Sequence, residues 1–345
     1  MLRPTLRTLP STLKSLTTTR LHSTTTTTAT TSVSPNELSH FSSLASSWWD
    51  PQGPSRVLHL MNPVRHDFIA SCLAESTPIT TIPSTPTDAP KRNTLRYLDI
   101  GCGGGIFAES LARTIPTTTD PASSTPTRTR AAEITALDPS STLIKIARDH
   151  ARLDPVVEGH LETGRFKYVN STLEEYIPTL TSTTTTPTST TNGSQEGGKK
   201  FDVVTLFEVI EHIDNVPGSI TPQGFLSSCL SMVKPGGWLI GSTIARTFPS
   251  WIVNQVIAEA PWPVGVVPKG THEWSKFVNP GELQAWVQEG LMRGADGGAR
   301  RGGSEVLEGM SWRCEGVVYF PGLGWKIVKG SESWGNYFWA VRKGV

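Results

Sequence analysis

Short apolar runs alternate along the middle of the chain with segments whose apolar residues recur at helical spacing. Apolar runs of this length are typical of buried strands, and they cover residues 95–100, 134–138, 166–169, 201–207 and 238–242. Helical spacing appears in 106–112, 143–147 and 225–233. Strands that alternate with helices predict an α/β fold with a doubly wound, mostly parallel sheet.

Five segments interrupt this pattern because they are rich in Thr, Ser and Pro or in Gly and Arg. They are residues 1–34, 76–93, 116–130, 178–200 and 294–305. Such segments have too few large apolar side chains to offset the entropy lost on ordering, so we expect disordered inserts. About 240 residues remain, which is enough for one large domain. We therefore predict a single domain over 35–345.

The first 34 residues have the pattern of a mitochondrial presequence. Four basic residues and no acidic residue precede Glu37, and leucines recur on one helical face at positions 2, 6, 9, 13 and 16. Basic, acid-free amphipathic segments are typical of import signals, and cleavage is expected within 21–34. A disordered basic tail is the alternative, because Pro4 and Pro10 weaken a helix.

Charge and cysteine content exclude several classes of protein. The 31 basic residues barely exceed the 30 acidic ones, and without the leader the acidic residues are in excess. A slightly acidic body argues against nucleic acid as a partner. The four cysteines are far apart in the sequence, so neither a disulfide framework nor a zinc knuckle is indicated. No apolar run reaches the roughly 18 residues of a membrane span.

A glycine-rich turn follows the first expected strand and predicts a nucleotide cofactor. Residues 101–105 read Gly-Cys-Gly-Gly-Gly, and an acid, Asp138, ends the second strand. Nicotinamide dinucleotides and S-adenosylmethionine both require such a turn and an acid that holds the ribose. A dinucleotide fingerprint beginning at Gly101 needs glycine or alanine at its sixth place, where this chain has Ile106. This comparison favours S-adenosylmethionine.

The pattern Asp99-x-Gly101-x-Gly103-x-Gly105 resembles motif I of class I S-adenosylmethionine-dependent methyltransferases, which have a Rossmann-like fold. The resemblance implies that Asp99 helps to hold the amino group of the cofactor. It also implies that the glycine turn backs the methionine portion and that Asp138 accepts hydrogen bonds from the ribose.

Several stretches are similar to a narrower group, the ubiquinone-biosynthesis O-methyltransferase family. They are Trp48-Trp49-Asp50, Asn62-Pro63-Val64-Arg65, Glu208-Val209-Ile210-Glu211-His212, Val267-Pro268-Lys269-Gly270-Thr271-His272-Glu273-Trp274 and Asn336-Tyr337-Phe338. The resemblance spans 47–345. It implies that Arg65, Gly101, Asp138 and the residue at Phe207 contact the cofactor. A guanidinium suits the carboxylate of the methionine end, which it can bind bidentately.

Glu208, Glu211 and His212 are the candidates for activating a phenol. A free phenol titrates near pH 10, so a base or a metal ion must help to remove its proton. On a helix that begins after the fourth strand, these three side chains would share one face. The family resemblance assigns them to Mg²⁺, and the imidazole also admits Mn²⁺ or Zn²⁺. A metal-free base or a structural cluster are the alternatives, and His272 is a second candidate base.

The segment 248–277 is apolar and contains several tryptophans, with Glu259 the only charge between Arg246 and Lys269. It is expected to form a lid. It either packs on its own domain or lies in a membrane interface, where Lys269 and Lys276 would meet anionic headgroups. The resemblance favours the membrane.

The sequence therefore predicts a mitochondrial matrix O-methyltransferase, peripheral on the inner membrane. The resemblance implies methylation of ring hydroxyls on 3,4-dihydroxy-5-polyprenylbenzoate and demethylubiquinol, within a multi-subunit coenzyme Q biosynthesis complex. A methyltransferase for a soluble catechol and a non-catalytic scaffold subunit of such a complex are the alternatives.

Overall fold

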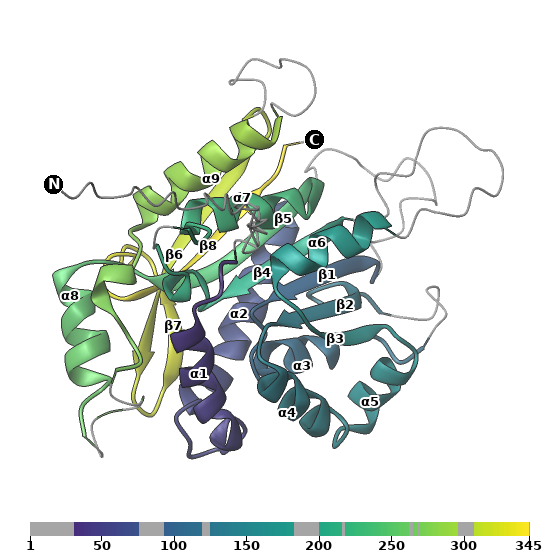
Figure 1. Ribbon diagram of the computed structural model, residues 1–345, viewed down its shortest axis with the longest axis horizontal. Helices are drawn as coiled ribbons and strands as arrows, with labels where there is room; N and C mark the ends of the chain where they lie inside the picture. The colour runs from purple at the N-terminus through teal and green to yellow at the C-terminus, as the bar shows by residue number, and fades with distance from the viewer. Residues whose placement is uncertain are drawn as a thin grey trace, which may run out of the picture. The chain divides into compact units, whose positions relative to one another are not determined.

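An eight-stranded sheet organises the part of the chain that the structure, a computed structural model, describes (Figure 1). That part comprises residues 31–75, 93–118, 125–182, 200–215, 218–261, 265, 267, 270–295 and 307–344. The strand order is β3-β2-β1-β4-β5-β8-β6-β7. The first five strands in this order are parallel, whereas β8, β6 and β7 pair antiparallel.

The strands are β1 (Leu95–Ile100), β2 (Ala131–Asp138), β3 (Phe166–Asn170), β4 (Phe201–Phe207), β5 (Val233–Ile244), β6 (Ser311–Phe320), β7 (Gly324–Val328) and β8 (Asn336–Arg342). The α-helices are α1 (Pro35–Ser43), α2 (Arg56–Glu75), α3 (Ile106–Ala112), α4 (Ser141–Ala151), α5 (Pro155–Glu162), α6 (Leu173–Ser182), α7 (Pro222–Ser231), α8 (Phe248–Trp251) and α9 (Pro280–Ala295). Shorter helical segments are η1 (Ala45–Ser47), η3 (Ile210–His212), η4 (Ile252–Ile257), which is a π-helix, and η5 (Trp274–Lys276).

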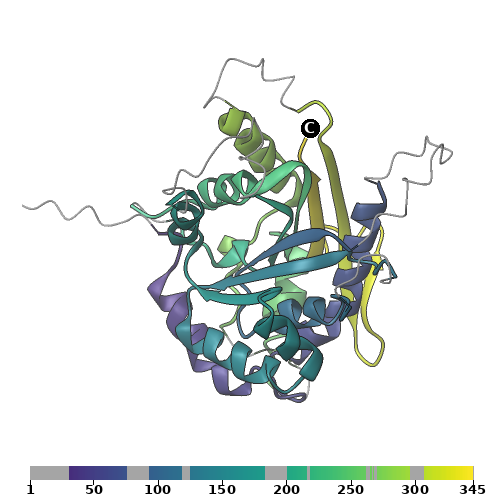
Figure 2. The same ribbon diagram turned by 90° about the vertical axis from the view of Figure 1, so that its right-hand side faces the viewer.

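Helices cover both faces of the sheet (Figure 2). On one face, α2, α3, α4 and α5 pack their apolar side chains against alternate strand residues such as Tyr97 and Trp238. On the other face, α6, α7 and α9 pack against the intervening residues, among them Leu98 and Leu239. Because side chains alternate across a strand, a parallel sheet buried on both faces needs nearly continuous apolar strands. This requirement explains the runs seen in the sequence.

The chain order reverses between β1 and β4, and this switch point fixes where a ligand can bind. From β1 the chain proceeds through β2 to β3, and it then returns to β4 on the other side of β1. The connections on the two sides therefore diverge and leave a crevice beyond the carboxyl ends of the strands. Asp99 in β1, Asp138 at the end of β2 and Glu208 after β4 all lie at that edge.

The five predicted strands and the doubly wound, mostly parallel sheet are confirmed. Two predicted inserts are shorter than expected. Thr127 accepts and donates hydrogen bonds near the start of β2, the buried Tyr97 hydroxyl donates to the Thr129 carbonyl, and α6 continues through Pro178. The remainder of the predicted inserts lies mostly outside the described residues.

Residues 31–34 and α1 belong to the same compact unit as the rest of the described chain. Ser32 and Ser34 are buried, and the Ile220 amide donates to the Thr31 carbonyl. Proline at the first helical position and Glu37 in the first turn favour a helix start at residue 35. The predicted presequence falls largely on residues 1–30, which lie outside the described residues.

Candidate active site

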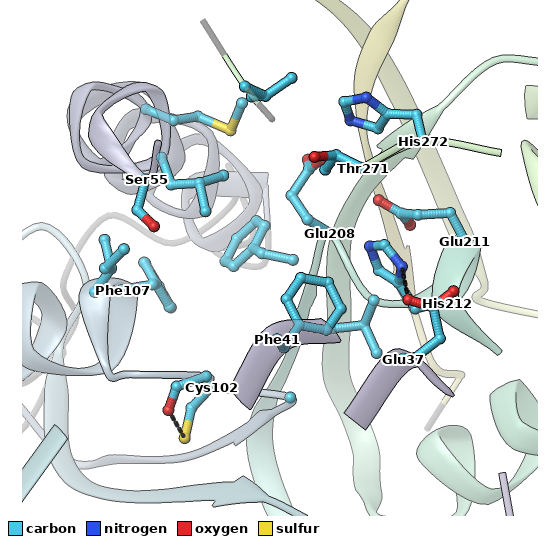
Figure 3. A pocket seen from close by; sticks show the side chains of 18 of the residues that line it. Glu37, Phe41, Ser55, Cys102, Phe107, Glu208, Glu211, His212, Thr271 and His272 are labelled. Atoms are coloured by element: carbon cyan, nitrogen blue, oxygen red, sulfur yellow. Dashed lines mark hydrogen bonds and ion pairs between the residues drawn. The ribbon is translucent and has the colours of Figure 1, made fainter. Parts of the chain in front are cut away.

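A cavity of about 580 Å³ lies at the carboxyl ends of the parallel strands. Its floor is the glycine turn after β1 together with the ends of β2 and β4, and its sides come from α1, α2 and the strands β6 and β7. Residues of the segment 253–272 complete the wall (Figure 3). The structure thus brings the predicted cofactor and acceptor residues to one cavity.

The glycine turn passes so close to its neighbours that side chains would not fit. Gly101 and Gly103 have φ angles of 69° and 54°, which glycine adopts without strain. A Cβ on Gly101 would lie 2.6 Å from Cγ2 of Val209, and one on Gly103 would lie 2.8 Å from Cζ2 of Trp48. Because these two glycines have no side chains, the turn can lie beneath the Trp48 ring and form the cavity floor.

Two acids flank the turn, and burial raises the pKa of both. Asp99 Oδ1 accepts a hydrogen bond of 2.6 Å from Thr205, and burial raises the pKa of Asp99 to about 7. Asp138 accepts 2.8 Å hydrogen bonds from the amides of Gly103 and Ser140. Burial raises the pKa of Asp138 to about 6. Asp138 therefore braces the glycine turn and also faces the cavity.

Arg65 reaches the cavity from α2 and is buried. Its Nη1 donates to Asn62 at 3.1 Å, and its guanidinium carbon lies 4.9 Å from the centre of the Phe207 ring. Burial lowers the pKa of Arg65 to about 10, opposed by the charges of Glu208 and Asp99. Phe207, where the family resemblance implies a cofactor contact, thus packs its ring against the predicted carboxylate-binding group.

Three buried polar atoms on the cavity wall have no hydrogen-bond partner within the described residues. They are Asp99 Oδ2, Arg65 Nε and Trp48 Nε1. Buried polar groups without partners are uncommon, because each costs free energy. One acceptor and two donors match a ligand with an ammonium and a carboxylate, which the methionine portion of S-adenosylmethionine carries. The residues present therefore fit this cofactor.

Glu208 and Glu211 lie on the opposite wall, near the end of β4 (Figure 3). Glu208 accepts hydrogen bonds from Ser242 at 2.5 Å and from Asn336 at 3.3 Å. Glu211 is buried and accepts a 2.8 Å bond from Thr243. Burial and the charge of Glu208 raise the pKa of Glu211. Hydroxyl and amide donors from β5 and β8 thus fix both carboxylates.

The predicted helix beginning at Glu208 is wrong. Glu208 has a φ angle of 56°, its amide donates to the Ser242 carbonyl in continuation of the sheet, and only the 3-10 turn η3 follows. The chain turns sharply here, and the next residue, Val209, lies against Gly101. Proximity of Glu208, Glu211 and His212 therefore arises from this turn and not from one helical face.

The two candidate bases, His212 and His272, each pair through Nδ1 with a carboxylate. His212 lies 3.1 Å from Oε2 of Glu37, and His272 lies 3.1 Å from Oε1 of Glu259. Burial lowers the pKa of His212, but the hydrogen bond to Glu37 and the charges of Glu211, Glu37 and Glu208 outweigh it, and the net shift is upward. Burial lowers the pKa of His272. Both imidazoles line the cavity.

The predicted metal ligands do not form a preassembled metal site. Within the described ranges, no group of three or more His, Cys, Asp or Glu side chains is arranged to hold a metal ion. Ser242 and Asn336 bind the Glu208 oxygens, and Glu37 binds Nδ1 of His212. The donor types suit a divalent cation, but their arrangement does not.

Exposed apolar side chains surround the side of the cavity away from the glycine turn. In α8 and η4, Phe248 is 69% exposed, and Trp251, Val256 and Ile257 are also exposed. Leu323, in the turn between β6 and β7, is 71% exposed, and its neighbour Phe320 and the loop residue Trp334 are exposed as well. None of the described helices is long and apolar enough to cross a membrane.

Lys276 does not face outward as a headgroup ligand. Its Nζ lies 2.7 Å from Asp214, 2.9 Å from Glu37 and 3.6 Å from Glu273. Through Glu37 and Asp214, these ion pairs tie the end of the lid segment to α1 and to the chain after η3. Lys269, the other predicted lysine, lies outside the described residues.

Sequence reasoning missed two residues of this cavity. The sequence predicts no chemical role for Trp48, although this side chain covers the glycine turn. No sequence pattern predicts a role for Glu37, which is only the first acidic residue after the leader. Its contact with His212 joins positions 175 residues apart, and no local pattern encodes such a pairing.

Comparisons with known proteins show which family the chain is similar to. A family model described as "Methyltransferase domain" matches residues 74–290. The mitochondrial ubiquinone biosynthesis O-methyltransferase of Candida albicans is 30% identical over 91% of this chain and 86% of its own. That of Schizosaccharomyces pombe is 36% identical over 75% and 72%. Among solved structures, the plantazolicin methyltransferase BamL covers 90% of this chain and 97% of its own, with 12% identity and a TM-score of 0.46.

The fold, the glycine turn and the family model define a class I S-adenosylmethionine-dependent methyltransferase. The extent and identity of the curated matches then show that the chain belongs to the ubiquinone biosynthesis O-methyltransferase family.

Proposed function

We propose that the chain transfers a methyl group from S-adenosylmethionine to a ring hydroxyl of polyprenylated ubiquinone precursors in mitochondria. The precursors are 3,4-dihydroxy-5-polyprenylbenzoate and demethylubiquinol. One observation carries the proposal: a single cavity joins the glycine turn, a wall of carboxylates and imidazoles, and an apolar mouth. The names of the relatives, several of them mitochondrial, support the substrate class and the location.

The cofactor lies on the glycine turn in this proposal. Arg65 binds its carboxylate, Asp99 holds its ammonium, and Asp138 accepts the ribose hydroxyls. The absence of side chains at Gly101 and Gly103 accommodates Val209 and Trp48, and Phe207 packs behind the guanidinium of Arg65. The unpartnered atoms Arg65 Nε and Asp99 Oδ2 support this placement, because a bound zwitterion would satisfy both.

Affinity for S-adenosylhomocysteine is expected to fall about tenfold between pH 8 and pH 6. Asp99 has a pKa of about 7 because it is buried, so its carboxylate is protonated as the pH falls through 7. A neutral acid no longer pairs with the ammonium of the ligand. Calorimetric titration at each pH measures the effect, and Asp99→Asn should bind weakly and lose most of the pH dependence. Equal affinities of the parent protein at both pH values would contradict this role.

His212 acts as the general base. Its Nδ1 faces Glu37, which leaves Nε2 to accept the proton of the ring hydroxyl. As that proton moves, the bond between the ring oxygen and the methyl carbon forms and the carbon–sulfur bond breaks, with its electron pair remaining on sulfur. Glu208 and Glu211 lie beside His212 and hold the second ring hydroxyl. His272 is the second candidate for the base.

A divalent cation on Glu208, Glu211 and His212 stays a prediction of the sequence. Two carboxylates and an imidazole would bind Mg²⁺, Mn²⁺ or Zn²⁺, and a bound cation would lower the pKa of a chelated catechol. Methyl transfer measured before and after EDTA treatment tests the prediction. Loss of turnover that returns with added metal would support a cation, whereas turnover unaffected by EDTA would leave His212 or His272 as the base.

The exposed apolar side chains of α8, η4 and the β6–β7 turn are the proposed membrane-facing surface. They border the cavity, and Ile257, Trp334 and Pro321 belong both to its lining and to these segments or their neighbours. Aromatic and aliphatic side chains favour the bilayer interface. A polyprenyl tail could then stay in lipid while the ring enters the cavity. In this proposal the protein is peripheral on the matrix side of the inner membrane, within a coenzyme Q biosynthesis complex.

Replacing Phe248 and Leu323 together by serine is expected to lower binding to vesicles by at least about tenfold, because each side chain contributes roughly 1.5–3 kcal/mol when fully buried. Sedimentation with cardiolipin-containing vesicles measures bound protein. Turnover of a short-tailed soluble substrate should change little. Leu153→Ser is the matched control, because Leu153 is 77% exposed but lies outside this surface, between α4 and α5. Equal loss in the control would contradict the proposal.

The rate with and without a prenyl tail tests the substrate class. We expect kcat/KM for a prenylated dihydroxybenzoate to exceed that for the tail-less compound by at least about tenfold, because several apolar carbons leave water. Equal values would indicate a methyltransferase for a soluble catechol. No turnover of either compound, with intact cofactor binding, would indicate a scaffold subunit.

A further inference from the structure

The N-terminal helix α1 touches the imidazole of His212 at two points. Glu37 Oε2 lies 3.1 Å from Nδ1 of His212. One turn later, the Phe41 ring packs edge-on against the same imidazole, with 4.8 Å between ring centres and an interplanar angle of 88°. Residues four apart share one face of a helix, so a single rigid element holds both contacts. Figure 3 shows both side chains beside His212.

A second partner fixes the Glu37 carboxylate itself. Its Oε1 accepts a 2.9 Å bond from Lys276, whose Nζ also pairs with Asp214 at 2.7 Å. Burial would raise the pKa of Glu37, but the hydrogen bonds and charges of His212 and Lys276 lower it to about 2. Glu37 is therefore ionised throughout the neutral range. It links α1, the turn after β4 and the η5 end of the lid segment.

The contact with Glu37 determines which nitrogen of His212 can accept a proton from a group in the cavity. A carboxylate at Nδ1 accepts a hydrogen bond from the N–H of that nitrogen. In the neutral ring, the proton therefore stays on Nδ1 and Nε2 is unprotonated. Carboxylates that orient functional imidazoles in this way fix both the tautomer and the ring orientation. The other charged or titratable groups facing the ring are Glu208 and Glu211 on its own segment and His272 across the cavity.

From these contacts we propose that Glu37 is a positioning residue, which holds His212 with Nε2 directed toward the acceptor hydroxyl and makes α1 part of the active site. The inference rests on the proposed function of His212. The proposal requires a hydrogen-bond acceptor at residue 37, and an apolar side chain of similar volume should not replace it.

Three variants of the full chain test the proposal. Glu37→Leu removes the acceptor but keeps the volume, and it should lower kcat about 10- to 100-fold with little change in either KM, as typically follows loss of a carboxylate that orients a histidine. Glu37→Gln keeps a carbonyl oxygen and should recover most of the loss. Glu273→Gln removes a different carboxylate from Lys276 without touching His212, and it should keep parental turnover.

A double-mutant cycle and a tautomer measurement test the positioning by Glu37 separately from the proposal that His212 is the base. In the His212→Gln background, Glu37→Leu should have no further effect on kcat, because the group that it positions is gone. Nitrogen NMR of labelled histidine should show His212 protonated at Nδ1 in the parent and in Glu37→Gln, and at Nε2 in Glu37→Leu. This readout needs no turnover, so it tests the positioning even if His212 is not the base.

The opposite results would overturn the proposal. An unchanged tautomer in Glu37→Leu would do so, as would equal losses of kcat in Glu37→Leu and Glu37→Gln. A loss in Glu37→Leu that persists undiminished in the His212→Gln background would show that residue 37 acts elsewhere. Thermal melting of each variant checks that the fold is intact, and Glu37→Gln provides the test if Glu37→Leu fails to fold.

Discussion

Replacing His212 by glutamine is expected to lower kcat about 10²- to 10⁴-fold, which is the range that a positioned general base contributes. The imidazole lines the cavity, and its Nδ1 is paired with Glu37. Glutamine is similar in size and keeps hydrogen-bonding atoms, but it cannot accept a proton at neutral pH. Affinity for S-adenosylhomocysteine should stay within about twofold of the parent, because this ligand lacks the acceptor ring.

The matched comparison for this prediction is His272→Gln. His272 also lines the cavity, and it pairs with Glu259 as His212 does with Glu37. It should lose less than about tenfold in kcat if His212 is the base. Single-turnover rates with labelled cofactor measure both variants. A large loss in His272→Gln beside near-parental turnover in His212→Gln would reverse the assignment.

Replacing Arg65 by methionine is expected to weaken binding of S-adenosylhomocysteine by about 10- to 150-fold, from a hydrogen bond to a charged group of about 1.5–3 kcal/mol. Arg65 is buried and has an unpartnered Nε within the described part of the chain. Methionine fills much of the same space beside the Phe207 ring but carries no charge. Asp99 and Glu208 also lose the cation that faces them.

Two further variants sharpen this result. Arg65→Lys should recover only part of the affinity, because an ammonium cannot form the paired contacts of a guanidinium with a carboxylate. Arg128→Met is the control, because Arg128 is largely exposed and pairs with Asp67 away from the cavity. Calorimetric titration measures each affinity. If Arg65→Met bound S-adenosylhomocysteine as tightly as the parent protein, Arg65 would not be a cofactor-binding residue.

The parallel strands could be predicted because most of them are buried on both faces. The runs 95–100 and 201–207 are nearly continuous in apolar residues, and glycines or acids end them. No such apolar run predicted β6 and β7, because most of their residues are only half-buried. Helix α5 was missed because it is short, although Asp154 caps it through hydrogen bonds to the amides of Val156 and Val157.

The cofactor side of the cavity was more predictable than the acceptor side. Asp99, Gly101 and Asp138 follow strands that the apolar pattern had already located, so the sheet itself brings them together. On the acceptor side, Glu208 adopts a left-handed conformation that no periodicity encodes. The contact of Glu37 with His212 depends on how α1 packs, which is tertiary information.

The most direct test is to identify the product that the full-length protein forms from methyl-labelled S-adenosylmethionine and a prenylated dihydroxybenzoate. Mass spectrometry and NMR locate the label. We expect one labelled methyl ether on a ring oxygen, with S-adenosylhomocysteine formed in equal amount and product formation strongly reduced in His212→Gln. Label on a ring carbon, or no labelled product from a protein that binds S-adenosylhomocysteine normally, would contradict the proposed reaction.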